Sequence, residues 1–400
     1  MARITKETSK AKPDKRSAAP QKKPALAEQT TAGAAHEDEY RAQKPVAARQ
    51  IVAFWKQNDL GLFGRRPDRL IEQWLADPAI DKVIVFELPT TVAAINHWLR
   101  LSVQPDAICA SEFRLLLSHY LAKLHGELNT DKLIYCSYLQ AEEALDGPRY
   151  LRWVMAKLKQ LKVSQPEVWL WPICAVNDAL LQAINPSQII VDFVDDQRLF
   201  PGTDNVQESY TKQYEWLIRR ANKVVSNSPG LITSFEKEFG VAVTLLENAD
   251  ISDNAAAPTD SIETEAAPKA PRSPADTRKR VGFVGNMRGR MHIPLLQELI
   301  RGYRDVEFIF VGQTHGSEFY KACHKEPNVS FKGTLRQSEA DALARQFDLA
   351  IIPFVKDALV SSMSPIKSVT FSRLGVPALS TLDLTEAQFR KAFHRAVQTT

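Results

Sequence analysis

The sequence predicts an α/β protein with two parallel-sheet domains. Two observations indicate this class: strand-like and helix-like segments alternate up to residue 250, and the same alternation starts again after residue 279. The composition agrees, because 44% apolar and 24% charged residues are typical of a globular chain, and 400 residues suffice for two cores. We therefore expect a tail over residues 1–48, a first domain over 49–250, a linker over 251–279 and a second domain over 280–400.

The tail combines basic residues with very few large apolar ones. It cannot bury enough surface to offset the entropy lost on ordering, so we expect it to be disordered. Two interpretations stay open: an inert extension, or a weak electrostatic tether to anionic lipid or to a partner. No secretory signal and no apolar run of membrane-spanning length is visible. We expect a cytoplasmic protein, with peripheral contact at the inner face of the membrane as the alternative.

Charge and cysteine spacing argue against several functional classes. The net charge is only +4 and the excess lies largely in the tail, so we expect no nucleic-acid partner. The cysteines are too far apart for a metal knuckle or a redox pair, which predicts buried free thiols at Cys109, Cys136, Cys174 and Cys323. The histidines lack the usual zinc spacings, and no P-loop or GxSxG pattern occurs. We expect no metal and no cofactor.

The first domain opens with a strand, a loop, a helix and a second strand. Residues Ile51–Trp55 are a buried-strand candidate, and a glycine-containing loop follows over Asn58–Arg66. Pro67 suits the first turn of a helix, and apolar residues recur after it at helical spacing: Leu70, Ile71, Trp74 and Leu75. The next strand is expected over 82–88. This order is a βαβ unit, which implies a parallel sheet.

The same alternation predicts the remaining elements of both domains. In the first domain we expect further strands over 132–139, 168–176, 188–196, 223–228 and 242–250, with helices between them. The linker is rich in Ala, Pro, Thr, Ser and Glu. In the second domain we expect strands over 280–286, 306–312, 329–333 and 349–354, and helices over 292–303, 317–325 and 337–347. A helix and a strand are expected within 364–381.

Candidate ligand residues follow the predicted strands, because ligands of open α/β sheets bind beyond the carboxyl ends of the strands. Gly285 and Asn286 begin a small-residue loop that leads into a helix, where backbone N–H groups and the helix dipole favour an anion. Arg288 and Arg290 in the same loop could bind a diphosphate. The alternative is a routine strand-to-helix turn with two solvated arginines.

Two further clusters stand at strand ends. A serine-rich loop ends in Ser364, Pro365 and Lys367, and a lysine at a helix start is disfavoured by the helix dipole unless an anion is present. The segment VDFVDDQRLF places Asp195 and Asp196 together with Asp192. Close carboxylates suit a general base, the binding of hydroxyl groups or a divalent cation. The alternative is that one of them caps a helix.

Eight segments carry a resemblance to a known family when they are taken in chain order. They are residues 63–76, 191–200, 221–231, 245–250, 281–287, 306–313, 326–335 and 349–381. In these segments the chain resembles the GT-B glycosyltransferases of bacteria, the broad group that includes the retaining family four and teichuronic-acid-type enzymes. The similarity covers roughly residues 50–385. It implies two Rossmann-like domains, with the acceptor on the first and the nucleotide on the second.

The resemblance also implies roles for residues. The reaction would move a sugar from a nucleotide-sugar donor to a glycan or lipid-linked acceptor, such as a growing cell-surface polysaccharide. The donor-side residues would be Gly285, Asn286, Arg288, Arg290, Gly333, Ser364, Pro365, Lys367 and Thr370. The acceptor-side residues would be Gly64, Arg65 and Arg66, with Asp195 or Asp196 as the catalytic base.

Three departures from the family pattern keep other functions open. The ribose-binding glutamate of the family aligns with Thr370, a Gly-Val-Pro turn over 375–377 replaces Gly-Lys-Pro, and the second domain is expected to be short at its C-terminus. A threonine offers one neutral contact where a carboxylate accepts two hydroxyl groups. The alternative function is a non-catalytic GT-B module that binds a nucleotide-sugar or glycan, or a partner subunit. A nucleotide-sugar epimerase is a third candidate.

Overall fold

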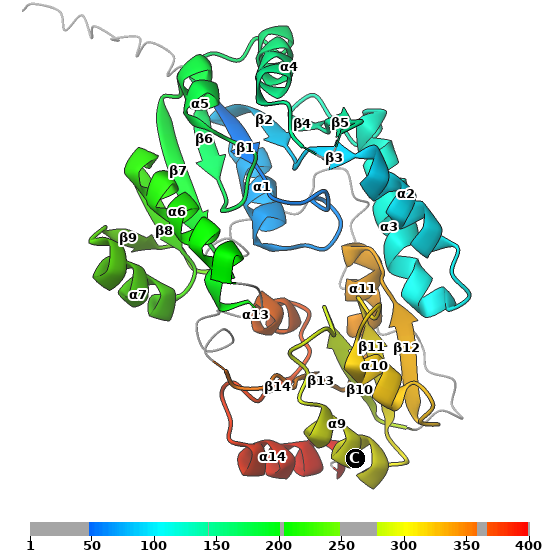
Figure 1. The fold of residues 1–400 in the computed structure, drawn as a ribbon. Helices are drawn as coiled ribbons and strands as arrows, with labels where there is room; N and C mark the ends of the chain where they lie inside the picture. Colours follow the sequence, from blue (N-terminus) through cyan, green and yellow to red (C-terminus); the bar gives the residue numbers. More distant parts are fainter. Residues whose placement is uncertain (1–47, 143, 201–203, 249–277, 358–365, 399–400) are drawn as a thin grey trace, which may run out of the picture. The chain divides into compact units, whose positions relative to one another are not determined.

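The computed structural model describes residues 48–142, 144–200, 204–248, 278–357 and 366–398. Nearly all of the expected tail and linker lies outside these ranges, and so do the predicted donor residues Ser364 and Pro365. Both sheets belong to one compact unit, Ala47–Thr400. Helices and parallel strands alternate along the described chain, which confirms the predicted fold class (Figure 1).

The first sheet has seven parallel strands in the order β4-β2-β1-β6-β7-β8-β9. The strands are β1 (Arg49–Phe54), β2 (Ile80–Phe86), β4 (Leu133–Cys136), β6 (Glu167–Leu170), β7 (Gln188–Phe193), β8 (Lys223–Ser226) and β9 (Val243–Leu245). The helices are α1 (Arg66–Ala76), α2 (Val92–Ser102), α3 (Ala107–Leu124), α4 (Gly147–Gln160), α5 (Asp178–Ile184), α6 (Asp204–Arg220) and α7 (Pro229–Phe239). Short strands β3 (Thr90–Thr91) and β5 (Leu139–Gln140) pair separately, and η1 (Gln197–Leu199) follows β7.

Both faces of this sheet are covered, as expected for parallel strands. Alternate residues of β1 enter different cores: Val52 and Phe54 pack in one, Ile51 and Ala53 in the other. This explains why the strands read as nearly continuous apolar runs rather than as alternating patterns. Pro67 lies in the first turn of α1, which confirms the helix start predicted from the sequence.

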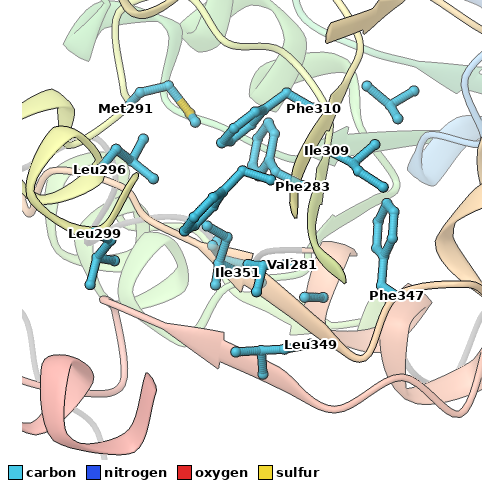
Figure 2. Packing of buried hydrophobic residues seen from close by; sticks show 14 of the residues in the cluster. Val281, Phe283, Met291, Leu296, Leu299, Ile309, Phe310, Phe347, Leu349 and Ile351 are labelled. Carbon is cyan, nitrogen blue, oxygen red and sulfur yellow. The ribbon is translucent and has the colours of Figure 1, made fainter. Parts of the chain in front are cut away.

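The second sheet has five parallel strands in the order β12-β11-β10-β13-β14. They are β10 (Arg280–Val284), β11 (Glu307–Val311), β12 (Val329–Gly333), β13 (Leu349–Ile352) and β14 (Ala378–Ser380). The helices are α9 (Ile293–Gly302), α10 (Glu318–Cys323), α11 (Gln337–Ala344), α13 (Ile366–Arg373) and α14 (Glu386–Gln398). Figure 2 shows the core of this sheet, where Phe283 and Phe310 project from adjacent strands among aliphatic side chains.

Some elements differ from the prediction. The expected strand over 168–176 ends at Leu170, because Pro172 follows closely and cannot donate to a ladder. The expected strand over 132–139 is divided into β4 and β5. Beyond the last predicted strand, α14 packs Phe389 and Phe393 into the second core. All four cysteines are buried free thiols, as predicted.

Candidate functional site

Two hollows lie at the carboxyl ends of the strands. Hollow A has a volume of about 190 Å³ and is lined by Phe63, Gly64, Arg65, Val284, Gly285, Asn286, Val311, Gly312, Gln313, Thr334, Leu335, Gln337, Ala340, Asp341, Ala344, Ile366, Lys367, Thr370, Phe371 and Leu374. Hollow B has a volume of about 310 Å³ and is lined by Trp55, Lys56, Gln57, Arg65, Arg66, Pro67, Trp171, Pro172, Val194, Asp195, Gln197, Phe200, Asn227, Asn248, Asn286, Arg290, Phe354, Ile366, Lys367 and Leu382. The two hollows share Arg65, Asn286, Ile366 and Lys367.

The loop after β1 contributes to both hollows, and a buried polar network holds it in place. Lys123 of α3 donates to the carbonyl oxygens of Asn58 and Leu60 and pairs with Glu87 at 2.5 Å. The Lys123 and Glu87 side chains are fully buried. Burial raises the pKa of Glu87 to about 7, and the Lys123 ammonium opposes that rise. His119 also bonds the Leu60 carbonyl, at 2.7 Å.

The far end of this loop is fixed by carboxylates. Asp68 accepts hydrogen bonds from the backbone N–H of Gly61 and Arg65, each at 2.7 Å. The Arg65 guanidinium pairs with Asp59 at 2.6 Å. Gly64 has φ +58°, and a Cβ there would lie 2.6 Å from the side chain of Gln337, so this position requires glycine. Arg65 therefore reaches the shared part of the two hollows from a loop that is held at both ends, whereas Gly64, expected on the acceptor side, lines hollow A alone.

The loop after β10 approaches Lys367 closely. Gly285 has φ +147°, and a Cβ there would lie 2.3 Å from the Lys367 side chain. The N–H of Gly285 donates to Val311, and that of Met287 to Gln313, at 2.8 and 3.2 Å. These two N–H groups are therefore not free to bind an anion, contrary to the simplest expectation for a glycine-rich loop.

The two arginines of this loop have different surroundings. Arg290 lines hollow B, with its guanidinium 4.9 Å from the ring centre of Phe200. Arg288 lines neither hollow and pairs with Glu112 of α3 at 3.2 Å. Burial raises the pKa of Glu112, and the Arg288 guanidinium opposes the rise. The sequence places the two arginines together, whereas the structure brings only Arg290 to a hollow.

Lys367 and Arg65 are the two cations that line both hollows, and Arg65 is paired with Asp59. The Lys367 ammonium lies 5.8 Å from the ring centre of Phe283 and 5.4 Å from that of Phe354. Burial lowers the pKa of Lys367 to about 8, and the nearby Arg290 and Arg65 lower it further while Asp195 opposes them. A lysine whose positive charge is disfavoured in this way is well suited to receive an anion.

The wall formed by α13 and α11 carries the polar groups of hollow A. The Thr370 hydroxyl donates to the carbonyl of Ile366 at 3.0 Å, so one of its hydrogen-bonding capacities is already used. Asp341 is a carboxylate in hollow A that the sequence analysis did not identify. It accepts hydrogen bonds from Gln337 at 2.5 Å and from Arg373 at 3.1 Å. A carboxylate accepts about four hydrogen bonds, so two remain for a ligand.

Gly333 lies just outside hollow A. Thr334 and Leu335, its neighbours, line the hollow instead. A Cβ at Gly333 would meet Ser111 of α3 at 2.4 Å, and the Ser111 hydroxyl accepts from the N–H of Thr334 at 2.8 Å. The segment after β12 therefore packs on α3, and α3 places its first turns against the second sheet.

The three clustered aspartates separate into different roles. Asp192 is fully buried and pairs with Arg66 at 2.9 Å, while Trp171 donates to it at 3.0 Å. Asp196 accepts from the N–H of Arg198 and pairs with its guanidinium, which confirms the capping interpretation for one of the three. Asp195 alone of the three lines hollow B. The predicted residue Arg66 lines this hollow too, but its charge is already neutralised by Asp192.

Comparison with solved structures identifies the architecture. Sucrose-phosphate synthase from Thermosynechococcus elongatus matches with a TM-score of 0.54 and 13% identity, over 87% of this chain and 89% of that chain. The apo structure of OtsA matches with a TM-score of 0.51 and 10% identity, over 88% of this chain and 92% of that chain. This chain has a GT-B fold. No protein-family model matches the sequence, and no curated protein does either.

The GT-B fold explains the location of the hollows. Two parallel sheets each present the carboxyl ends of their strands, and that edge is where ligands of such sheets bind. Among the described residues, no group of three or more His, Cys, Asp or Glu side chains is arranged to hold a metal ion. None of the described helices combines the length and apolar character needed to cross a bilayer.

Proposed function

We propose that this GT-B protein is a glycosyltransferase that moves a sugar from a nucleotide-sugar donor to a glycan or lipid-linked acceptor. Hollow A would hold the nucleoside diphosphate and hollow B the acceptor. The observation that carries the proposal is the junction of the two hollows at Lys367, Asn286 and Arg65. The sugar passes directly from the donor to the acceptor, so the donor and acceptor sites have to meet at one point.

The charges at this junction suit the chemistry of the leaving group. Breaking the bond between the sugar and the diphosphate leaves negative charge on the phosphate oxygen. Lys367 and Arg290 lie where they could stabilise this charge, in a partly buried setting that strengthens the interaction. These side-chain cations would stabilise the leaving group, and no cofactor is proposed besides the donor substrate.

Two carboxylates complete the proposed roles. Asp341 would accept hydrogen bonds from the ribose hydroxyls, a task that Thr370 can perform only weakly. Asp195 would act on the acceptor, as the general base or as the group that orients its hydroxyl. Retention of configuration at the transferred sugar is part of the proposal, because the family that the sequence resembles is largely retaining.

One observation favours a second candidate, a non-catalytic module that binds a nucleotide-sugar or a glycan. Asp192 and Asp196 are both paired with arginines, so neither carboxylate is free to act on a substrate. The sequence resemblance agrees, because Thr370 aligns with a glutamate of the family. Under this alternative, both hollows bind their ligands but no sugar is transferred.

A two-stage experiment separates the candidates. Thermal shift measurements with a panel of nucleoside diphosphates come first, and we expect at least one to raise the melting temperature, because ligands that bind the folded state stabilise it. No shift with any of them would reject the glycosyltransferase and would leave, of the second candidate, a module that binds a glycan. The corresponding nucleotide-sugars are then screened for hydrolysis and transfer, with product stereochemistry determined by NMR. Binding without turnover would favour the non-catalytic module.

A further inference from the structure

Hollow B has a strong imbalance of charge. Among the described residues that line it, five are basic and Asp195 is the one acidic residue. Two of the five are already neutralised, since Arg65 pairs with Asp59 and Arg66 with Asp192. Asp195 alone does not balance the remaining positive charge, so the hollow favours a bound anion.

Lys56 is a basic residue of hollow B to which the proposed donor binding gives no role. It follows β1, it lines hollow B and not hollow A, and its side chain is half-buried. Within the described part of the chain, its ammonium has neither a hydrogen bond nor an ion pair, and its contact is with the ring of Trp55 at 5.7 Å. Burial lowers the pKa of Lys56, and Arg65 and Arg290 lower it further while Asp195 opposes them.

A second observation points to hydroxyl groups on the same ligand. The side-chain oxygen Oδ1 of Asn227 is buried and has no hydrogen-bond partner within the described residues, and Asn227 itself is 3% exposed. Asn227 follows β8 and lines hollow B. An unsatisfied buried acceptor is costly, and a donor from a bound ligand would relieve that cost. The buried side chains of Trp55 and Trp171 also line hollow B, so the Asn227 amide lies in a wall that is partly apolar, as in most ligand pockets.

We infer that the acceptor is a sugar carrying an anionic group, a phosphate or a carboxylate, which Lys56 binds while Asn227 accepts from a sugar hydroxyl. This inference rests on the proposed function in one respect, the assignment of hollow B to the acceptor. The binding of an anionic sugar in hollow B does not depend on what the donor site binds. Phosphate and carboxylate share the chemistry that an ammonium recognises, so the two sources are separated by experiment.

The test is calorimetric titration of the full chain with glucose 6-phosphate, glucuronate and glucose at constant ionic strength. Each titration is done alone and with the nucleoside diphosphate that gives the largest thermal shift. We expect at least one anionic sugar to bind about tenfold tighter than glucose, as one charge-assisted hydrogen bond implies. Phosphate is the group if glucose 6-phosphate is preferred, and carboxylate if glucuronate is.

Variants assign the preference to the two residues. Lys56→Met should remove the preference for the anionic sugar, Lys56→Arg should keep most of it, and Asn227→Ala should weaken all sugars alike. Lys223→Met is the matched control, because Lys223 is exposed at the first residue of β8, the opposite end of that strand from Asn227. Equal binding of glucose and both anionic sugars would overturn the inference, and so would no sugar binding at all.

Two further outcomes keep this test separate from that of the proposed function. If Lys56→Met weakens the nucleoside diphosphate and leaves the sugars unchanged, Lys56 belongs to the donor site and the inference is overturned. If no nucleoside diphosphate binds but the preference for an anionic sugar depends on Lys56, the inference stands and the glycosyltransferase proposal fails. A melting temperature within about 2 °C of the parent shows that the fold of a variant is intact, and this is expected for Lys56, which is half-buried, and for Lys223, which is exposed. The same criterion is applied to Asn227→Ala, whose side chain is buried.

Discussion

Hollows A and B share one edge but differ in how they would select a ligand. Hollow A is lined mainly by small and apolar residues, with Arg65, Asp341 and Lys367 as its charged groups. Hollow B carries five basic residues and several amides. If the proposed function holds, hollow A would recognise its ligand mainly by shape and hollow B mainly by charge. Lys367 lines both hollows, so its ammonium could contact the ligands of both.

The largest expected effect comes from breaking the network that holds the loop common to both hollows. Lys123→Met removes the partner of the fully buried Glu87 and leaves an uncompensated carboxyl group. We expect a loss of about 3–5 kcal/mol in the free energy of unfolding, measured by urea denaturation. The double variant Lys123→Met with Glu87→Gln should recover much of this loss. A double variant no more stable than the single one would show that the ion pair is not the cause.

The junction is tested by Lys367→Met compared with Arg288→Met. Lys367 lies in both hollows, so its loss should reduce the affinity for a nucleoside diphosphate by about 10–100-fold, the value of a hydrogen bond to a charged group. Arg288 pairs with Glu112 outside both hollows, and its loss should change the affinity by less than about threefold. Titration calorimetry measures both. A larger effect of Arg288→Met would contradict this placement of the diphosphate.

The pH dependence of binding gives an effect of intermediate size. The pKa of Lys367 is lowered to about 8 by burial, Arg290 and Arg65, so its ammonium is present below this pH and is lost above it. We expect the affinity for a nucleoside diphosphate to fall up to about tenfold between pH 8 and pH 9. Lys367→Arg, which stays charged, should abolish the decline. An unchanged decline in this variant would assign the titration to another group.

The same shift affects stability in the opposite direction. The ordinary pKa of the group is 10.5, so the unfolded chain holds more protons at this site between about pH 8 and pH 10.5. The contribution of Lys367 to the free energy of unfolding therefore rises with pH across that window. Denaturation curves of the parent and of Lys367→Met should converge as the pH increases.

The smallest expected effect tests how hollow A recognises the nucleoside. Asp341→Asn keeps the shape of the side chain and removes its charge. If Asp341 binds the ribose hydroxyls, the affinity for a nucleoside diphosphate should fall by about 3–10-fold, while that for inorganic pyrophosphate stays the same. Equal losses for both ligands would indicate an indirect effect through Arg373, which pairs with Asp341.

Much of the fold could be predicted from the sequence because its information is local. Continuous apolar runs such as Ile51–Phe54 indicate strands covered on both faces, and Pro67 indicates where α1 begins. The alternation of such elements implies parallel sheets, and parallel sheets determine the edge at which ligands bind. On this reasoning alone, Gly285 and Lys367 could be expected near one another, and they are in contact.

The tertiary structure decided which polar residues at that edge are available. Arg66 and Asp192 are separated by more than a hundred residues, yet each neutralises the other, so neither acts as a free charge in hollow B. No sequence motif marks Asp341 or Lys56. Asp341 lines hollow A because of how α11 packs, and Lys56 lines hollow B because of the conformation of the loop after β1. Sequence spacing carries no information on such distant pairings. The sequence by itself determined the sheets and their ligand-binding edge, while the pairing of buried charges in three dimensions decided the chemistry available at that edge.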